Sequence, residues 1–368
     1  MSTIHWTESA ITRSARWHSE SGSPPPHPVV CVDDTIRADA AHRLAKAGTG
    51  LLWRGDYHNA RHLLAALGRR VDRRAPAPGP TALDTFHRHR EFQGHRATVL
   101  GRLLILLDED HVVDLRRAPD VRQACVEAYG PPTEPTVVSL RELLGVLGAH
   151  QWRSRGVDVP ALDARVYPHY GVFAPVRAEY VELVATAPLP EGRGSAFDLG
   201  TGTGVLAAVL ARRGIGHVTA TDSSPRALAC ARDNLTRLGL AERVDLRPGL
   251  YPDGRADLVV GNPPWLPGRP TSSLEGGVYD QDSVMLRDFL AGLAAHLAPG
   301  GAGWLVLSDL AERIGLRTRS QLLAMIDDAG LRVLDRIDTR PRHRRAADTA
   351  DPLHAERHAE VTSLWQLA

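Results

Sequence analysis

Two short motifs carry residue types that could do chemistry, and the first is a glycine-rich turn. Asp198-Leu-Gly200-Thr-Gly202-Thr-Gly204 directly follows a short apolar run and opens a helical pattern. Glycines let a backbone turn sharply and lie against a ligand without a Cβ in the way. The acid two residues before the first glycine suits a cationic amino group like that of a methionine moiety. A nicotinamide site would instead need a third glycine where Val205 stands.

A second acid, Asp222, directly follows the next apolar run, residues 217–221. A carboxylate at about this distance from a glycine loop can accept hydrogen bonds from both hydroxyls of a ribose. The same side chain could also cap the helix expected from Pro225. Both roles can hold together.

The sharpest signal is Asn262-Pro263-Pro264-Trp265, directly after the apolar run 256–261. Two successive prolines make a stiff, projecting turn, because each fixes φ and lacks an N–H donor. The side chain of Asn262 and the carbonyl of Pro263 could then both accept from one NH2 group, and Trp265 could stack on a flat acceptor or pack beside it. We expect this turn to orient an amide, exocyclic amine or guanidine nitrogen for in-line reaction without a metal.

With these motifs, residues 165–310 resemble the class I methyltransferases that carry an (N/D)PP(Y/F/W) motif. This family includes release-factor glutamine, ribosomal-RNA and DNA adenine methyltransferases. The resemblance implies an enzyme that uses S-adenosylmethionine to methylate a planar nitrogen. It also implies an α/β fold with a Rossmann-like sheet of seven strands, the last two forming an antiparallel hairpin.

The resemblance also assigns roles by position. The methionine part of the cofactor would lie against Asp198, Gly200, Gly202 and Gly204, and its ribose against Asp222. Asn262 and Pro263 would hold the acceptor nitrogen, within a catalytic turn completed by Pro264 and Trp265. Trp265 replaces the commoner tyrosine of the glutamine enzymes. This difference weakens the inference that glutamine is the acceptor here too.

Three further cofactor contacts follow from the resemblance. Phe173 and Arg177 lie in a segment similar to the one that closes over the cofactor, although its spacing differs by one residue from that of the glutamine enzymes. Phe173 could instead pack a domain junction. Leu250, after the third apolar run of this half, is the expected adenine contact.

Two polar segments are candidates for contact with the acceptor. Glu275-Gly-Gly-Val-Tyr279-Asp280 has glycines typical of a mobile lid, and Glu275, Tyr279 or Asp280 could touch the substrate, with a carboxylate binding a cationic one. The run Arg340–Arg345 falls in the loop after the sixth expected strand, where it could meet phosphates or a carboxylate. Either segment could also be an ordinary solvated loop.

The elements that must position these residues divide the chain in three. Residues 1–30 are polar and proline-rich, and we expect a flexible arm. Residues 31–160 show helical spacing of apolar residues, which predicts a separate, mainly helical substrate or lid domain. Residues 161–368 alternate short apolar runs with helical patterns, as expected of a parallel sheet in a catalytic domain.

Composition excludes several other classes of protein. The chain has 368 residues, 43% of them hydrophobic, and a net charge of +1, which indicates no global attraction to nucleic acid. Its three cysteines are far apart, and no metal-ligand spacing occurs, so we expect neither disulfides nor a metal. No apolar run reaches the roughly 20 residues that span a bilayer, and the first residues lack a signal peptide's apolar core. We therefore expect a cytoplasmic protein that contacts no membrane.

Three classes of acceptor remain open: a protein glutamine, a base of RNA or DNA, and a small molecule such as an amino acid, guanidine or natural-product amide. A non-catalytic cofactor-binding module is a less favoured alternative, because both motifs are intact. The oligomeric state is not indicated.

Overall fold

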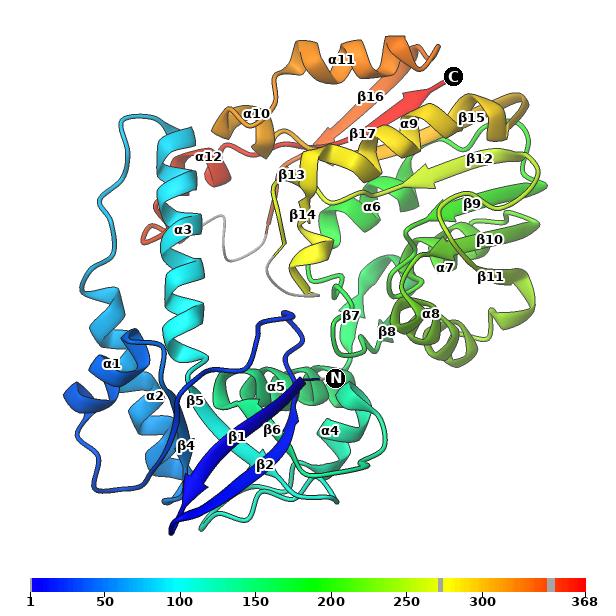
Figure 1. Ribbon diagram of the computed structural model, residues 1–368. Helices are drawn as coiled ribbons and strands as arrows, with labels where there is room; N and C mark the ends of the chain where they lie inside the picture. The colour runs from blue at the N-terminus through cyan, green and yellow to red at the C-terminus, as the bar shows by residue number, and fades with distance from the viewer. Residues whose placement is uncertain (1, 271–273, 343–347) are drawn as a thin grey trace. The chain divides into compact units, whose positions relative to one another are not determined.

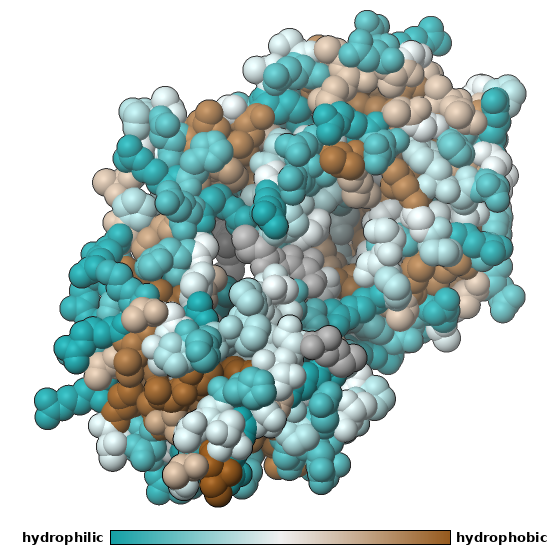
Figure 2. All heavy atoms as spheres, in the orientation of Figure 1, coloured by the Kyte–Doolittle hydropathy of each residue, from teal (hydrophilic) through white to brown (hydrophobic). Residues whose placement is uncertain are grey.

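The computed structural model describes residues 2–270, 274–342 and 348–368 (Figure 1). The chain divides into two compact units. Unit 1 takes the chain up to Pro78 together with His87–Gln151, and unit 2 takes Gly79–Phe86 together with Trp152–Ala368. None of the described helices is long and apolar enough to cross a membrane. On the face shown in Figure 2, hydrophilic and hydrophobic side chains are interspersed over both units.

Unit 1 is built on a six-stranded sheet with the order β1-β2-β6-β5-β4-β3. Its strands are β1 (Ser2–Glu8), β2 (Ile11–Trp17), β3 (Val29–Val32), β4 (Gly50–Trp53), β5 (Leu103–Leu107) and β6 (Thr136–Ser139). Its helices are α1 (Ala38–Lys46), α2 (Tyr57–Asp72), most of α3 (Ala82–Leu100), α4 (Arg122–Tyr129) and most of α5 (Leu140–Arg155).

This sheet overturns two expectations. The flexible arm over residues 1–30 is wrong, because β1 and β2 pair as an antiparallel hairpin from Ser2 opposite Trp17. Alternate residues of the hairpin, such as Ile4 and Trp6, are buried. This polar segment therefore has the period of two that is typical of a half-buried strand. The mainly helical domain over 31–160 is also wrong, because four- and five-residue apolar runs such as Leu103–Leu107 are buried strands. Runs this short cannot be told from helix by periodicity.

Unit 2 is built on a seven-stranded sheet with the order β11-β10-β9-β12-β15-β17-β16. Its strands are β9 (Ser195–Leu199), β10 (His217–Asp222), β11 (Val244–Pro248), β12 (Ala256–Gly261), β15 (Leu297–Ser308), β16 (Val333–Thr339) and β17 (Thr362–Leu367). Neighbouring strands among the first five in this sheet pair in parallel, whereas β17 runs antiparallel to both β15 and β16. A short helix, α12 (His354–His358), interrupts the connection from β16 to β17, where no helix was expected.

Side chains alternate between the two faces of this sheet along each strand, so both faces carry apolar residues, and helices cover both. Ala196 and Val260 pack in the cluster formed with α6 and α7, whereas Phe197 and Val259 pack in the cluster formed with α9 and α11. The helices of unit 2 are α6 (Ala178–Thr186), α7 (Val205–Arg212), α8 (Pro225–Arg237), α9 (Val284–His296), α10 (Leu310–Ile314) and α11 (Arg319–Asp328).

Two pairs of short strands lie outside the large sheets. β7 (Val157–Val159) and β8 (Ala164–Val166) pair antiparallel around the 3-10 turn η1 (Pro160–Leu162). β13 (Leu266–Pro267) and β14 (Tyr279–Asp280) pair in parallel, and the 3-10 turns η3 (Leu274–Gly277) and η4 (Gln281–Ser283) flank β14. Because β9, β10, β12 and β15 are parallel, their carboxyl ends meet at one edge, where open α/β sheets bind ligands.

Candidate active site

The glycine loop lies at this edge, between β9 and α7. Gly200, Gly202 and Gly204 have φ values of 72°, 55° and 80°, a region that side chains other than glycine rarely adopt. A Cβ on Gly204 would also stand 3.2 Å from the Cα of Ala231 on α8. The loop therefore requires glycine both for its turn and for the close packing of α7 on α8.

Asp198 lies beneath this loop and is almost completely buried, with 1% of its surface exposed. Its Oδ2 accepts hydrogen bonds from the Thr201 hydroxyl at 2.6 Å and from the Ala207 amide at 3.0 Å. Its Oδ1 accepts none from the described residues. Burial raises the pKa of this carboxyl to about 6, against the lowering effect of the two hydrogen bonds. A cationic group at Oδ1 would favour the charged form.

Asp222 ties the end of β10 to the same loop. Its Oδ2 accepts from the Gly202 amide at 3.0 Å, and its Oδ1 accepts from the Ser224 amide at 2.9 Å. The helix cap of α8 is Ser224, whose side chain accepts from Ala227, so the capping role considered for Asp222 belongs to its neighbour. Each carboxylate oxygen has a second lone pair, so both remain able to accept from ligand hydroxyls.

The catalytic turn expected from the sequence follows β12. Gly261 ends that strand, and a Cβ there would stand 2.5 Å from the Phe289 ring of α9. The Oδ1 of Asn262 accepts a hydrogen bond from the indole Nε1 of Trp265 at 2.8 Å. The tryptophan therefore orients the asparagine side chain and leaves one lone pair of Oδ1 for another donor.

Arg177 contacts this turn. Its guanidinium carbon lies 5.0 Å from the centre of the Trp265 ring, a distance typical of a cation–π contact. Its Nη1 donates to the Oε1 of Glu360 at 2.9 Å, and the Ser308 hydroxyl donates to the same oxygen at 2.6 Å. Glu360 has no exposed surface. A chain of contacts thus runs from Glu360 through Arg177 and Trp265 to Asn262.

Sequence reasoning did not find Glu360 or Ser308. Glu360 stands 183 residues after Arg177, and no local motif marks it. Its burial next to a strand end is visible only in the folded chain. The contact of Arg177 with Trp265 was not predicted either, and the cofactor role that the resemblance implied for Arg177 stays a prediction.

The segment from Glu275 to Asp280 is held in place on two sides. A Cβ on Gly277 would stand 2.8 Å from the Cβ of Phe173, so this turn packs directly on Phe173. The Tyr279 ring lies 6.4 Å from the Phe86 ring, centre to centre. Phe173 thus packs against the predicted lid.

Asp280 has a structural role in place of the substrate contact expected for it. Its Oδ1 accepts from the Met285 amide at 3.1 Å, and its Oδ2 accepts from the Leu286 amide at 3.2 Å. The carboxylate therefore caps the first turn of α9, where unpaired amides attract negative charge. With 8% of its surface exposed, it presents no open face to a cationic acceptor.

The remaining candidates lie around this edge. The Leu250 carbonyl accepts from the Thr221 hydroxyl at 2.6 Å, which places the residue beside the end of β10. In the basic run, Arg342 donates to Glu182 on α6 at 3.4 Å, and residues 343–347 lie outside the described residues. The described residues contain no cluster of three or more His, Cys, Asp or Glu able to hold a metal.

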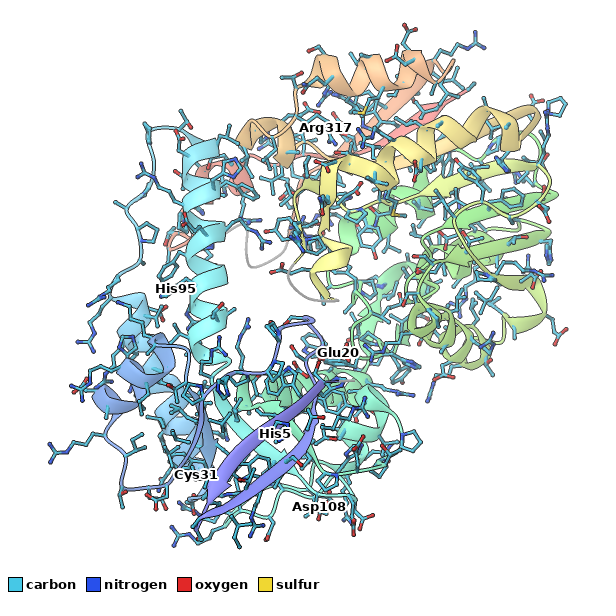
Figure 3. All side chains as sticks on the ribbon, in the orientation of Figure 1. His5, Glu20, Cys31, His95, Asp108 and Arg317 are labelled. Carbon is cyan, nitrogen blue, oxygen red and sulfur yellow. The ribbon has the colours of Figure 1, made fainter. Side chains whose placement is uncertain are left out.

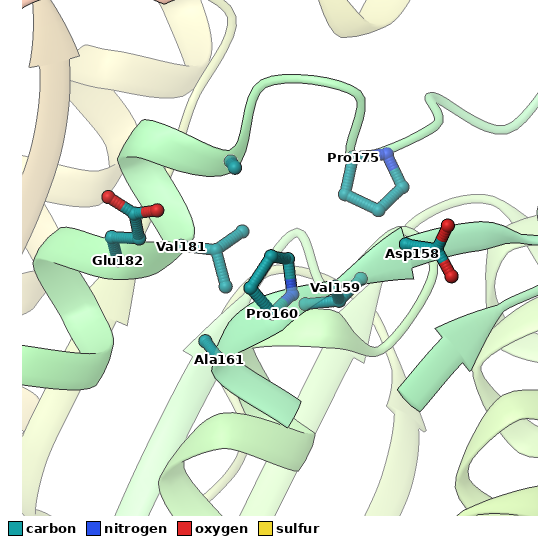
Figure 4. Close-up of a pocket in the computed structure, with 8 residues that line it drawn as sticks. Asp158, Val159, Pro160, Ala161, Pro175, Val181 and Glu182 are labelled. Atoms are coloured by element: carbon teal, nitrogen blue, oxygen red, sulfur yellow. The ribbon is translucent and has the colours of Figure 1, made fainter. Parts of the chain in front are cut away.

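A small surface hollow lies elsewhere on unit 2 (Figure 4). It is lined by residues of β7, η1 and α6, including Pro160 and Val181, together with Pro175. No candidate site residue lines it. The hollow is therefore separate from the strand edge that carries the glycine loop and the catalytic turn.

Comparison with known proteins agrees with this geometry. Residues 163–313 match the family described as the methyltransferase small domain. A release factor glutamine methyltransferase of Cereibacter sphaeroides is 34% identical over 182 residues, which cover 44% of this chain and 62% of that protein. Its counterpart in Gloeobacter violaceus is 32% identical over 174 residues, covering 42% and 58%. A ribosomal protein L11 methyltransferase of Pelotomaculum thermopropionicum is 34% identical over 151 residues, covering 39% and 40%.

Solved structures show a more distant likeness. A S-adenosylmethionine-dependent methyltransferase from Thiobacillus denitrificans, in complex with S-adenosyl-L-homocysteine, is 19% identical, with a TM-score of 0.35. The match covers 53% of this chain and 92% of that one.

The match of residues 163–313 to a methyltransferase family supports the resemblance predicted from the motifs of residues 165–310. The glycine loop and the catalytic turn both fall within this segment. The chain spans less than two thirds of the length of the relatives it matches. Residues outside the matched segment, including all of unit 1, lie beyond what the family describes.

Proposed function

We propose that this chain is an enzyme that transfers a methyl group from S-adenosylmethionine to a planar nitrogen. The observation that carries the proposal is the Asn262 carboxamide, which the Trp265 indole holds at the strand edge next to the glycine loop. A fixed acceptor oxygen there suits an NH2 group whose lone pair is delocalised. Such a nitrogen reacts only when it is closely aligned with the methyl group.

The residues of the edge divide the work as follows. Asp198 Oδ1 takes the amino group of the cofactor, the glycine loop lies along its methionine part, and Asp222 accepts from its ribose. Leu250 lies against the adenine. The cofactor supplies the methyl group when it is bound. Phe173, packed on the predicted lid, helps to close the site from water.

On the acceptor side, one lone pair of Asn262 Oδ1 is used by Trp265, and the second accepts one N–H of the acceptor. The Pro263 carbonyl accepts the other N–H. Arg177 covers one face of the Trp265 ring, so that face is closed to stacking by a nucleobase. This geometry favours a carboxamide acceptor over a base of RNA or DNA.

A protein glutamine is the acceptor we propose to test first. Two of the most similar relatives are named release factor glutamine methyltransferases, and a glutamine side chain is a carboxamide. A small-molecule amide is the second candidate. We also propose a cytoplasmic location, since all three cysteines are free thiols, as is usual in a reducing compartment.

The proposal is tested with S-adenosylmethionine that carries a labelled methyl group. The protein is incubated separately with a bacterial release factor, with glutamine-containing peptides, with ribosomal RNA and with small amides. Label should enter a carboxamide acceptor with the native chain and fall at least tenfold with Asn262→Ala, while binding of S-adenosylhomocysteine survives this change. Label in RNA alone would contradict the carboxamide assignment. Equal loss of cofactor binding in Asn262→Ala and Asp222→Ala would contradict the division of roles.

A further inference from the structure

Arg317 is a buried cation with an unused hydrogen-bonding edge. It lies in the loop between α10 and α11 (Figure 3), and 5% of its surface is exposed. Its Nε and Nη2 are both shielded from solvent and donate no hydrogen bond within the described residues. Burial lowers the pKa of this guanidinium. An unpaired buried charge is costly, so its presence needs an explanation.

The acids nearest to Arg317 are already engaged. The negative charges of Asp280 and Glu312 both raise the pKa of the Arg317 guanidinium, against the lowering effect of burial. However, the Asp280 carboxylate caps α9 through two backbone amides, and Glu312 accepts from the Nε of Arg319 at 2.8 Å. Neither acid forms an ion pair with Arg317 in the described part of the chain. The guanidinium therefore remains available to a further anion.

The shape of the unused edge indicates which anion fits. Elsewhere in this protein, Nε and Nη2 of one arginine together hold the two oxygens of one carboxylate. Examples among the described residues are Arg96 with Asp72, Arg117 with Asp56 and Arg122 with Asp120, at distances from 2.6 to 3.2 Å. Arg317 has the same pair of nitrogens without the carboxylate. Two-point pairing of this kind is specific to planar oxyanions.

Arg317 lies on the acceptor side of the site. Its neighbour Leu316 packs in one cluster with Leu266, which directly follows Trp265, and with Tyr279 of the predicted lid. β13 and β14, which carry Leu266 and Tyr279, are two residues long and pair only with each other. So short a pair has few backbone hydrogen bonds to break, and a local shift costs less free energy than opening one of the large sheets. A modest shift of this segment would give a ligand access to the shielded edge.

We propose that Arg317 binds a carboxylate carried by the methyl acceptor. The acceptor would then combine a planar nitrogen at Asn262 with a carboxylate held by the Nε and Nη2 of Arg317. This assignment to the acceptor rests on the proposed function, whereas the binding of a carboxylate at Arg317 does not.

Thermal unfolding of the full chain tests the carboxylate site with acetate as the probe. Acetate is compared with chloride at equal ionic strength, in the native chain, in Arg317→Met and in Arg319→Met. At ten times the dissociation constant, acetate should raise the native Tm by about 2–3 °C, and Arg317→Met should lose this rise. In chloride, Arg317→Met should unfold at the native Tm or higher, because an apolar chain replaces an unpaired charge. Arg319→Met, which loses its bond to Glu312, should unfold at a lower temperature.

Three results would overturn the proposal. An equal rise with acetate in the native chain and in Arg317→Met would place acetate elsewhere. A loss of stability in chloride as large as that of Arg319→Met would show that the chain itself satisfies Arg317. A response to phosphate without one to acetate would likewise overturn the carboxylate assignment. A separate titration of the native chain with S-adenosylhomocysteine keeps the two hypotheses apart, since its failure contradicts the proposed function alone.

Discussion

Cofactor affinity should fall about tenfold when the pH is lowered from 7 to 5, because Asp198 becomes protonated over this interval. Burial raises the pKa of its carboxyl to about 6, and only the carboxylate can hold the cationic amino group that we place at Oδ1. The ionised fraction is about ten elevenths at pH 7 and about one eleventh at pH 5, a tenfold ratio equivalent to about 1.4 kcal/mol. The amino group of the ligand stays charged over the same range.

The assay is calorimetric titration with S-adenosylhomocysteine at half-unit steps between pH 5 and pH 7.5. Binding near pH 6 should also release a proton, which is detected by repeating the titration in buffers with different ionisation enthalpies. Asp198→Asn is the control, because it keeps the hydrogen-bonding shape without a titrating group. It should bind more weakly and with a flat pH profile.

Two results would refute this reasoning about Asp198. A pH-independent affinity in the native chain would show that the carboxyl is ionised throughout or does not touch the amino group. The same tenfold fall in Asp198→Asn would assign the titration to another group, such as a histidine. The sign for stability is opposite to that for binding. Because the folded-state pKa is raised, the contribution of Asp198 to the stability of the ligand-free chain is greatest at low pH and declines as the pH rises through about 6.

Three further predictions concern the packing around the site. Trp265→Phe removes the 2.8 Å hydrogen bond to Asn262 but keeps an aromatic ring, so turnover should fall about fivefold while cofactor affinity is unchanged. The control Trp152→Phe, at a half-exposed position, should change neither turnover nor cofactor affinity. Glu360→Ala leaves the partly buried Arg177 without its carboxylate and should lower the free energy of unfolding by about 1.5–3 kcal/mol in denaturant titrations, against no change for Glu242→Ala on the surface. Gly204→Ala should destabilise by about 1–3 kcal/mol and weaken S-adenosylhomocysteine binding, because its φ of 80° is strained for alanine.

Local sequence predicted the parts of the site that are continuous in the chain. The glycine loop after β9 and the turn after β12 were predicted because glycines or prolines directly follow an apolar run in the sequence. The antiparallel pairing of β16 and β17 was also predicted. The hairpin of β1 and β2 was not predicted. Its buried residues alternate with exposed polar ones, and the segment as a whole is polar and runs into a proline-rich stretch. The short strands of unit 1 were missed for a related reason, since four apolar residues fit a helix or a strand equally well.

The sequence by itself determined the class of chemistry, since Asp198, the three glycines and the Asn-Pro-Pro-Trp turn stand in the order and spacing of a methyltransferase. Only the tertiary structure decided what those residues contact. It placed Asp280 at the first turn of α9, and it brought Glu360 to Arg177 across 183 residues. The physical reason is that backbone preferences act over a few residues, whereas burial and charge pairing depend on which distant strands become neighbours in the sheet.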